Sequence, residues 1–227
     1  RTTTSGALSN LEPGAKGTVA FSFQMPSSEE LAKLSNPYLS IAINAAGNRI
    51  SEKNVPENLQ STVQQKIAIA TDLQLSAQGL YYANPYGSQG SLTPKANVET
   101  TYALVFTMRN TTGKITGAKL IATLPPYVRW TGKKSPTYEN VSFNNVDSTV
   151  HWNIGDIAAG FGVASSTPRQ MAFEIGFTPS TSQIGQQPQL LRNISLTGID
   201  SSTGQKVTKK LQDVTTNLIQ VSKSADN

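Results

Sequence analysis

The sequence predicts an all-β protein made of antiparallel β-sandwich repeats in tandem. Short runs of alternating apolar and polar residues recur along the chain, and only one short stretch suits a helix. Hydrophobic residues make up 37% of the chain and charged ones only 15%, while 17 Gly and 12 Pro punctuate it. This composition is typical of all-β modules, whose turns use Gly, Pro and Asn.

The third observation is an internal repeat. The sequence HWNIGDIAAG at 151–160 has the layout of GALSNLEPG at 6–14, and each leads into an alternating run that ends at a proline. Further on, IAINAAG (41–47) matches ISLTGID (194–200), and KIAIATDLQLS (66–76) matches KLQDVTTNLIQVS (210–222). The offsets stay within about 145 to 154 residues, as in a repeat with altered loops. We expect 1–72 to be the C-terminal half of one repeat, 73–222 a complete repeat, and 223–227 the start of a linker or further repeat.

The first part of the chain contains the one helix candidate. Alternation at Val19, Phe21 and Phe23 predicts a strand, and residues 27–34 then suit a one- or two-turn helix with Ser27 and Glu30 as a capping box. A strand over 39–43 and a polar loop over 48–62 follow. Residues 66–76 predict one continuous strand across the repeat boundary. Since no Gly or Pro interrupts it, we expect a rod with limited hinge motion.

The second part predicts a series of strands. The clearest alternation is at 100–109, and 118–124 repeats it until Pro125 and Pro126 remove two backbone donors. Further strands are predicted near 128–130, 141–143, 150–154, 171–177, 194–196 and 211–221. Alternation indicates a sandwich core that includes Tyr102, Phe106, Leu124, Trp152, Ile154, Phe173 and Phe177.

These segments resemble the bacterial surface repeats known as domain of unknown function eleven. The resemblance covers residues 72–218 in full and 6–72 as the second half of a preceding copy. Its motif falls on Tyr102, Asn110, Gly113, Ala118, Leu124, Pro125, Val128, Trp152, Gly155, Ile157 and Gly160. The sequence departs from it where an Asp usually precedes Leu-Pro and in a long insertion between Trp130 and Val150. The resemblance implies immunoglobulin-like sandwiches in long secreted or wall-attached proteins, with no catalytic residues to carry over.

Composition also bounds the compartment and the partners. The chain has no cysteine, which excludes disulfides and favours a bacterial over an animal extracellular protein. No apolar run is long enough to span a membrane. The net charge of +5 comes from scattered Lys and Arg, without an arginine-rich run or a nucleic-acid motif, so we expect no nucleic-acid partner. Weak attraction to an anionic cell-wall polymer remains open.

No pattern indicates catalysis or a cofactor. The only histidine, His151, points away from the Trp152 face and has no nucleophile or metal-ligand spacing beside it. Asp72, Asp156 and Asp200 lie near turns but lack the spacing of a calcium loop. An internal Lys–Asn crosslink at Asn110 or Asn217 stays open, since nothing marks the lysine. The chain is therefore predicted to be neither an enzyme nor a cofactor protein.

The sequence leaves two functions open. The first is a structural repeat of a bacterial cell-surface or extracellular stalk or fibre, whose partners are neighbouring repeats of the same polypeptide or neighbouring subunits. The second is an adhesin that recognises glycan or host protein through exposed aromatics. Candidates for such ligand-binding aromatics are Tyr81, Tyr82, Tyr86, Tyr127 and Trp130.

Overall fold

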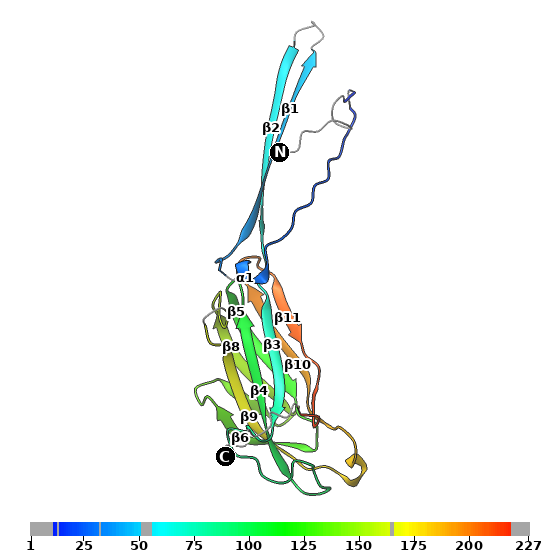
Figure 1. Cartoon of the computed structure of the whole chain (residues 1–227), viewed down its shortest axis with the longest axis vertical. Coiled ribbons are helices and arrows are strands. Elements are labelled where there is room, and N and C mark those ends of the chain that lie inside the picture. The colour runs from blue at the N-terminus through cyan, green and yellow to red at the C-terminus, as the bar shows by residue number, and fades with distance from the viewer. Residues whose placement is uncertain (1–10, 13, 32, 51–55, 164–165, 219–227) are drawn as a thin grey trace, which may run out of the picture.

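The structure is a computed structural model that describes residues 11–12, 14–31, 33–50, 56–163 and 166–218. Two parts lie one after the other along its long axis: a β-sandwich, and a long two-stranded ribbon that projects from one end of it (Figure 1). Strands account for 52% of the described residues, and helix is almost absent from them. The predicted all-β antiparallel sandwich is therefore confirmed.

The ribbon pairs β1 (Tyr38–Ile50) with β2 (Pro56–Ala68) in antiparallel register over their full length. This corrects the predicted loop over 48–62, because its described residues continue the two strands. The loop prediction failed because Asn48, Asn58 and Gln60 lie on the polar face of the ribbon rather than in turns. Before the ribbon comes α1 (Ser28–Leu31), where Ser27 and Glu30 form the predicted capping box.

The sandwich consists of two antiparallel sheets. One has the order β3-β4-β9-β6, formed by β3 (Leu73–Leu80), β4 (Thr100–Asn110), β9 (Arg169–Phe177) and β6 (Val128–Ser135). The other has the order β11-β10-β5-β8-β7, with β12 also paired to β10. Its strands are β5 (Ile115–Thr123), β7 (Val141–Asn144), β8 (Thr149–Ile157), β10 (Gln189–Asp200), β11 (Lys206–Lys210) and β12 (Val214–Thr215). A single turn of 3-10 helix, η1 (Thr181–Gln183), precedes β10.

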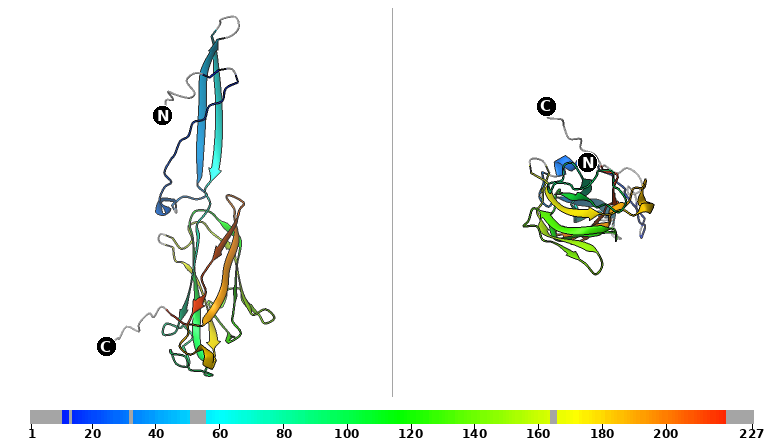
Figure 2. Two further views of the ribbon diagram at one scale, coloured as in Figure 1. Left: turned by 90° about the vertical axis from the view of Figure 1, so that its right-hand side faces the viewer. Right: turned by 90° about the horizontal axis from the view of Figure 1, so that it is seen from below.

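One hydrophobic core lies between the two sheets. Trp152, Phe106, Phe173 and Phe177 are fully buried in it, and Phe106 packs against both Trp152 and Phe173 with ring centroids 6.3 and 6.2 Å apart. All seven residues that alternation assigned to the core are at most 5% exposed. Seen from below, the two sheets form the layers of a narrow cross-section (Figure 2).

Three predicted strands need correction. Residues 19–23 are extended but form no strand, because no other described segment hydrogen-bonds to them. The predicted continuous strand over 66–76 is two strands, since β2 ends at Ala68 and β3 begins at Leu73. The predicted strand over 211–221 is interrupted as well: only Val214–Thr215 forms β12, residues 211–213 and 216–218 are irregular, and 219–221 lie outside the described residues.

The chain enters the sandwich at the ribbon end and leaves it at the opposite end (Figure 1). Strand β3 starts beside the ribbon and ends near Gly79, where Leu218 packs against it. The two ends of the sandwich are therefore separate surfaces, one facing the ribbon and one facing the C-terminal segment.

Candidate interaction surfaces

The loop of residues 81–99 covers part of the outer face of the β3-β4-β9-β6 sheet. Tyr86 reaches across the sheet and donates a hydrogen bond from its hydroxyl to the Ala172 carbonyl oxygen at 2.9 Å. Its ring packs on a small apolar cluster that includes Ala103 and Val105. Burial, together with the negative charge of Glu174, raises the pKa of the Tyr86 hydroxyl to about 12. Tyr86 therefore anchors the loop.

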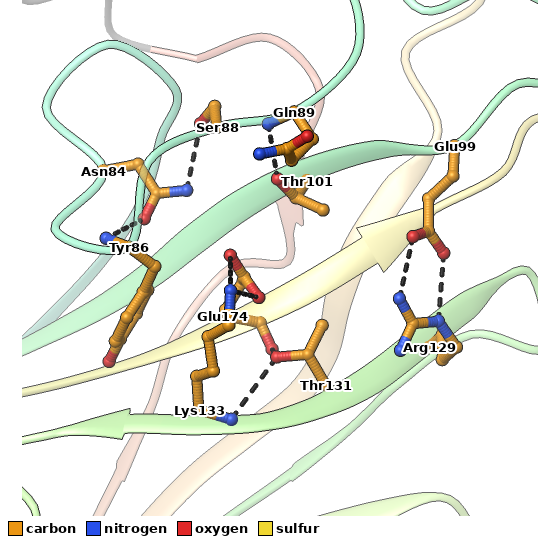
Figure 3. Close-up of polar contacts among 10 residues, drawn as sticks. All are labelled: Asn84, Tyr86, Ser88, Gln89, Glu99, Thr101, Arg129, Thr131, Lys133 and Glu174. Atoms are coloured by element: carbon orange, nitrogen blue, oxygen red, sulfur yellow. Dashed lines mark hydrogen bonds and ion pairs between the residues drawn. The ribbon is translucent and has the colours of Figure 1, made fainter.

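Polar contacts hold this loop and the neighbouring strands together (Figure 3). Asn84 accepts a hydrogen bond from the Tyr86 amide and donates one to the Ser88 hydroxyl. On the same sheet face the Glu174 side chain is only 3% exposed, and its carboxylate pairs with the Lys133 ammonium at 3.0 Å. The Lys133 side chain is 55% exposed, so solvent screens this pair.

The five candidate ligand-binding aromatics form no single platform. Tyr81 packs edge-on against Tyr82 at 5.2 Å, donates a hydrogen bond to the Gly90 carbonyl and extends inward to Tyr102. Tyr82 is 53% exposed. These two and Tyr86 do not line the groove that contains Tyr127 and Trp130, which is described next.

Tyr127 and Trp130 line an open groove of about 470 Å³ at the β6 edge of the sandwich. The Trp130 ring stacks on Phe143 at 5.7 Å and packs against the core residue Phe173 at 4.9 Å. At the rim, the Arg129 guanidinium donates two hydrogen bonds to the Glu99 carboxylate. That pairing outweighs partial burial and lowers the pKa of Glu99. The groove thus combines an aromatic wall with a paired acid and base.

A buried polar network around Trp152 is a feature that sequence reasoning missed. The Trp152 indole N–H donates to a Glu139 carboxylate oxygen at 2.7 Å, and the Arg169 guanidinium donates to both Glu139 oxygens at 2.8 Å. Burial alone would raise the pKa of Glu139, but these hydrogen bonds and the positive charges of Arg169 and Lys134 outweigh it and lower that pKa. The network anchors the core tryptophan; it contains no nucleophile or general base in a groove.

The remaining titratable candidates are dispersed. His151 is half-buried, and its ring nitrogen Nε2 lies 2.8 Å from the Thr149 hydroxyl. Asp156 pairs with Lys114 at the surface, and Asp72 pairs with Lys209. Within the described ranges, no three His, Cys, Asp or Glu side chains come close enough to hold a metal ion, and no helix is long and apolar enough to cross a membrane.

One face of the ribbon, which we call its apolar face, is mainly apolar but also carries Gln65, Ser61 and the Arg49–Glu57 ion pair, and the other face is mainly polar. Directly paired residues of antiparallel strands share a face, so the register puts Ile43 opposite Val63 and Leu39 opposite Ile67 on one side. On the other side Asn44 faces Thr62, and the Thr62 hydroxyl donates to the Asn44 side chain at 2.8 Å. The apolar side is open to solvent: four of its residues are 47–57% exposed, namely Ile43, Leu59, Val63 and Ile67.

A second open apolar segment runs back alongside the ribbon from α1 (Figure 1, dark blue). In residues 15–27 the alternating apolar side chains are all exposed, Val19 at 43%, Phe21 at 57%, Phe23 at 53% and Met25 at 45%. Two isolated strands are at best marginally stable in water. Nine of the 18 exposed large hydrophobic side chains in the described residues lie on the ribbon and this segment.

The base of the ribbon is fastened to the sandwich by a partly buried polar cluster. The Thr71 amide donates to the fully buried Asp200 carboxylate at 2.8 Å, and the Thr71 hydroxyl donates to the Asn110 side chain at 2.8 Å. From the other side, the Asn36 amide donates to the Thr112 carbonyl at 3.1 Å, and the Ser202 hydroxyl donates to the Asn36 side chain. We call these residues the joint. The joint therefore holds the chain on both sides of the ribbon.

The fold therefore places the chain among all-β sandwich proteins, and comparison with known proteins goes little further. No protein-family model matches the chain, and no curated protein matches its sequence. One similar solved structure is the major pilin subunit of Bacillus cereus, with a TM-score of 0.38 and 10% identity over 75% of this chain and 47% of that one. Another is a protein of Corynebacterium diphtheriae described as membrane anchored, with a TM-score of 0.33 and 11% identity over 82% of this chain and 53% of that one. This chain thus spans about half the length of each, and likenesses this weak carry no argument about its function.

Proposed function

We propose that the chain is a structural repeat segment of an elongated bacterial cell-surface or extracellular stalk or fibre protein. The observation that carries the proposal is that the residues before the sandwich have a series of elements similar to that at the end of the sandwich. In the sandwich, β9 is followed by η1, β10 and β11; before it, an alternating extended segment is followed by α1, β1 and β2. A protein that repeats its elements in series is built for length.

Local geometry supports this equivalence at several points. Ser27 and Glu30 form a capping box one residue after Pro26, and Ser180 and Gln183 form another directly after Pro179. Each strand that closes a hairpin also ends in the same way. The Ile69 amide donates to the Pro37 carbonyl at 3.0 Å, and the Thr216 amide donates to the Pro188 carbonyl at 3.0 Å.

The path of the chain supports a linear arrangement of units. The sandwich is entered at the joint and left at its opposite end, so units that follow the same path stack head to tail (Figure 2). Each unit then contacts only its neighbours, and the joint fixes one against the next. The bacterial surface location rests on the sequence resemblance described above. A structural role requires no catalytic residue, and the titratable side chains described above lie in separate places.

Surface location can be tested with antibodies raised against this 227-residue chain. Intact cells of the source bacterium are expected to bind the antibody and to lose it after brief protease treatment. Labelling that appears only after lysis would refute the proposal. In parallel, small-angle scattering of the chain is expected to fit an elongated particle, since a 13-residue ribbon strand alone adds about 43 Å.

A second candidate function is glycan or host-protein binding at the Trp130 groove. The favouring observation is the aromatic wall beside the Glu99–Arg129 pair, since aromatic faces and paired charges suit sugar rings and their hydroxyls. A glycan array probed with the wild-type chain and with an Arg129→Ala variant tests it. Binding that the variant loses while its unfolding curve is unchanged favours an adhesin; no binding by the wild type excludes glycan recognition at this groove.

A further inference from the structure

The sandwich itself contains a covered counterpart of the open ribbon face. On β10, Ile194 and Leu196 point into the core and are at most 1% exposed. The matching residues in the ribbon are Ile41, which is half-buried, and Ile43, which is 52% exposed. Aliphatic side chains at matching positions of the two hairpins are therefore buried in the sandwich and at least partly exposed to solvent in the ribbon.

The extended segment shows the same contrast. On β9, Phe173, Ile175 and Phe177 are fully buried. Their counterparts Val19, Phe21 and Phe23 have similar apolar bulk but are 43–57% exposed. Both halves of a potential core are thus present outside the sandwich: one on the ribbon, one on the segment. Neither is covered by any described residue.

The strands that cover β9 and β10 in the sandwich indicate which strands the segment and the ribbon lack. Strand β9 hydrogen-bonds to β4 on one side and β6 on the other, and β10 hydrogen-bonds to β5. Resting on the proposed series of repeats, we propose that the apolar face of the ribbon and the segment 15–25 together form a docking surface for a half-sandwich of the β3–β8 type. That half-sandwich must supply two kinds of strand at once, one paired to the segment and one paired to β1.

The chemistry of this occupant follows from the residues that cover the apolar faces of β9 and β10 in the sandwich. Its strands alternate, with large apolar side chains inward in the manner of Phe106 on β4, Leu120 on β5 and Trp152 on β8. Its backbone satisfies the open edges of the segment and of β1, which are otherwise free to pair with other chains. The ribbon's polar face, with Asn44 and Thr62, stays in water, as an outer sheet face does.

The occupant is inferred to be covalently joined to this chain, leading into Gly14. In the sandwich, β8 passes to β9 through residues 158–168, which include Gly160, and Gly160 and Gly14 both have positive φ, at 71° and 81°. A covalent connection holds the two halves at a high effective concentration. A separate subunit would have to find the same surface without that advantage.

The experiment uses the chain's own strands as the occupant. A chimera is made in which residues 73–160 are placed directly before residue 15 of the chain, so that the β8-type strand leads into the segment through the equivalent glycine. Hydrogen exchange of residues 38–68 is compared between the chimera and the 227-residue chain. We expect exchange in the ribbon to slow by about 100-fold or more in the chimera, while the sandwich is unchanged in both.

Two matched variants of the chimera locate the docking face. Ile43→Asp with Val63→Asp places charges on the apolar face and is expected to abolish the added protection. Asn44→Asp with Thr62→Asp places the same charges on the polar face and is expected to keep it. Equal loss in both variants would overturn the assignment of the face.

Three outcomes would overturn the proposal. The first is ribbon exchange in the 227-residue chain that is already as slow as in the sandwich, because the region would then be self-sufficient. The second is a chimera whose ribbon exchanges as fast as that of the unmodified chain. The third is protection of the unmodified chain that grows with its concentration, which would assign the surface to a second copy. Surface labelling of cells is independent of all three, so failure here leaves the proposed function standing.

Discussion

Replacing Glu139 with Gln tests whether the buried network around Trp152 stabilises the sandwich as an ion pair. Glu139 is 2% exposed and accepts hydrogen bonds from the Trp152 indole and from two nitrogens of Arg169. The glutamine has nearly the same shape, but its NH₂ group replaces one of the two accepting oxygens and therefore faces an N–H donor of Trp152 or Arg169. It also leaves the Arg169 charge, whose side chain is 26% exposed, without a partner.

The expected cost is about 3 kcal/mol, at the low end for breaking a buried ion pair, because Arg169 retains some contact with water. For a domain of this size each kcal/mol lowers Tm by roughly 2–4 °C, so the expected shift is about 6–12 °C. Urea unfolding followed by tryptophan fluorescence measures the free energy directly. Removing the cation too, as in Glu139→Gln with Arg169→Met, is expected to recover part of the loss, since no unpaired charge stays behind.

Glu174→Gln serves as the matched control. Its carboxylate is as buried as that of Glu139, but its partner Lys133 is 55% exposed, so we expect a cost of about 1 kcal/mol. The reasoning fails if Glu139→Gln costs no more than Glu174→Gln, or if the double variant is no more stable than the single one.

The same network predicts an acid dependence. The folded-state pKa of Glu139 lies below its ordinary value of about 4.5, so the native protein binds this proton less readily than the unfolded chain. Its stabilising contribution is therefore complete above pH 4.5 and is lost as the pH falls through the lower, folded value. The difference in unfolding free energy between wild type and Glu139→Gln should shrink over that range; a difference independent of pH between 7 and 3 would contradict it.

Three further experiments test other parts of the structure. Thr71→Val removes the hydroxyl that contributes to the joint, and we expect it to lower the free energy of unfolding by about 1–3 kcal/mol and to speed proteolysis between ribbon and sandwich. Unchanged cleavage would show that the joint does not depend on this hydroxyl. Gly162→Ala should destabilise more than Gly185→Ala in thermal unfolding, because both have φ of +74° but only at Gly162 does the added Cβ meet neighbouring backbone, at 2.9 Å. In a spectrophotometric pH titration, Tyr86 and Tyr102 should ionise last, because burial raises the pKa of each hydroxyl to about 12, with a smaller electrostatic contribution from Glu174 at Tyr86 and from Tyr81 at Tyr102. Ionisation of all seven tyrosines near pH 10 would contradict this.

The sequence was sufficient to predict what depends on near neighbours in the chain. Alternation at Tyr102–Met108 and at Val150–Ile154 identified strands and their inward faces because the side chains of a strand point alternately to its two sides. The Ser27–Glu30 capping box was visible because its partners are three residues apart. Internal matches also suggested that the ribbon and the sandwich share a series of elements, a prediction that the experiments above address.

Only the tertiary structure determined what depends on distant residues. The prediction of a strand at Val19–Phe23 was wrong because a strand needs a hydrogen-bonding neighbour, and local alternation does not reveal whether one exists. The five candidate aromatics could not be recognised as two separate groups, because loop 81–99 and the β6 edge are brought to different places by folding. Glu139 and Arg169 meet across 30 residues around a tryptophan, and Thr71 meets Asp200 across 129. Such contacts are determined by the order and register of the strands in the sheets, which the alternation of residues along one strand does not reveal.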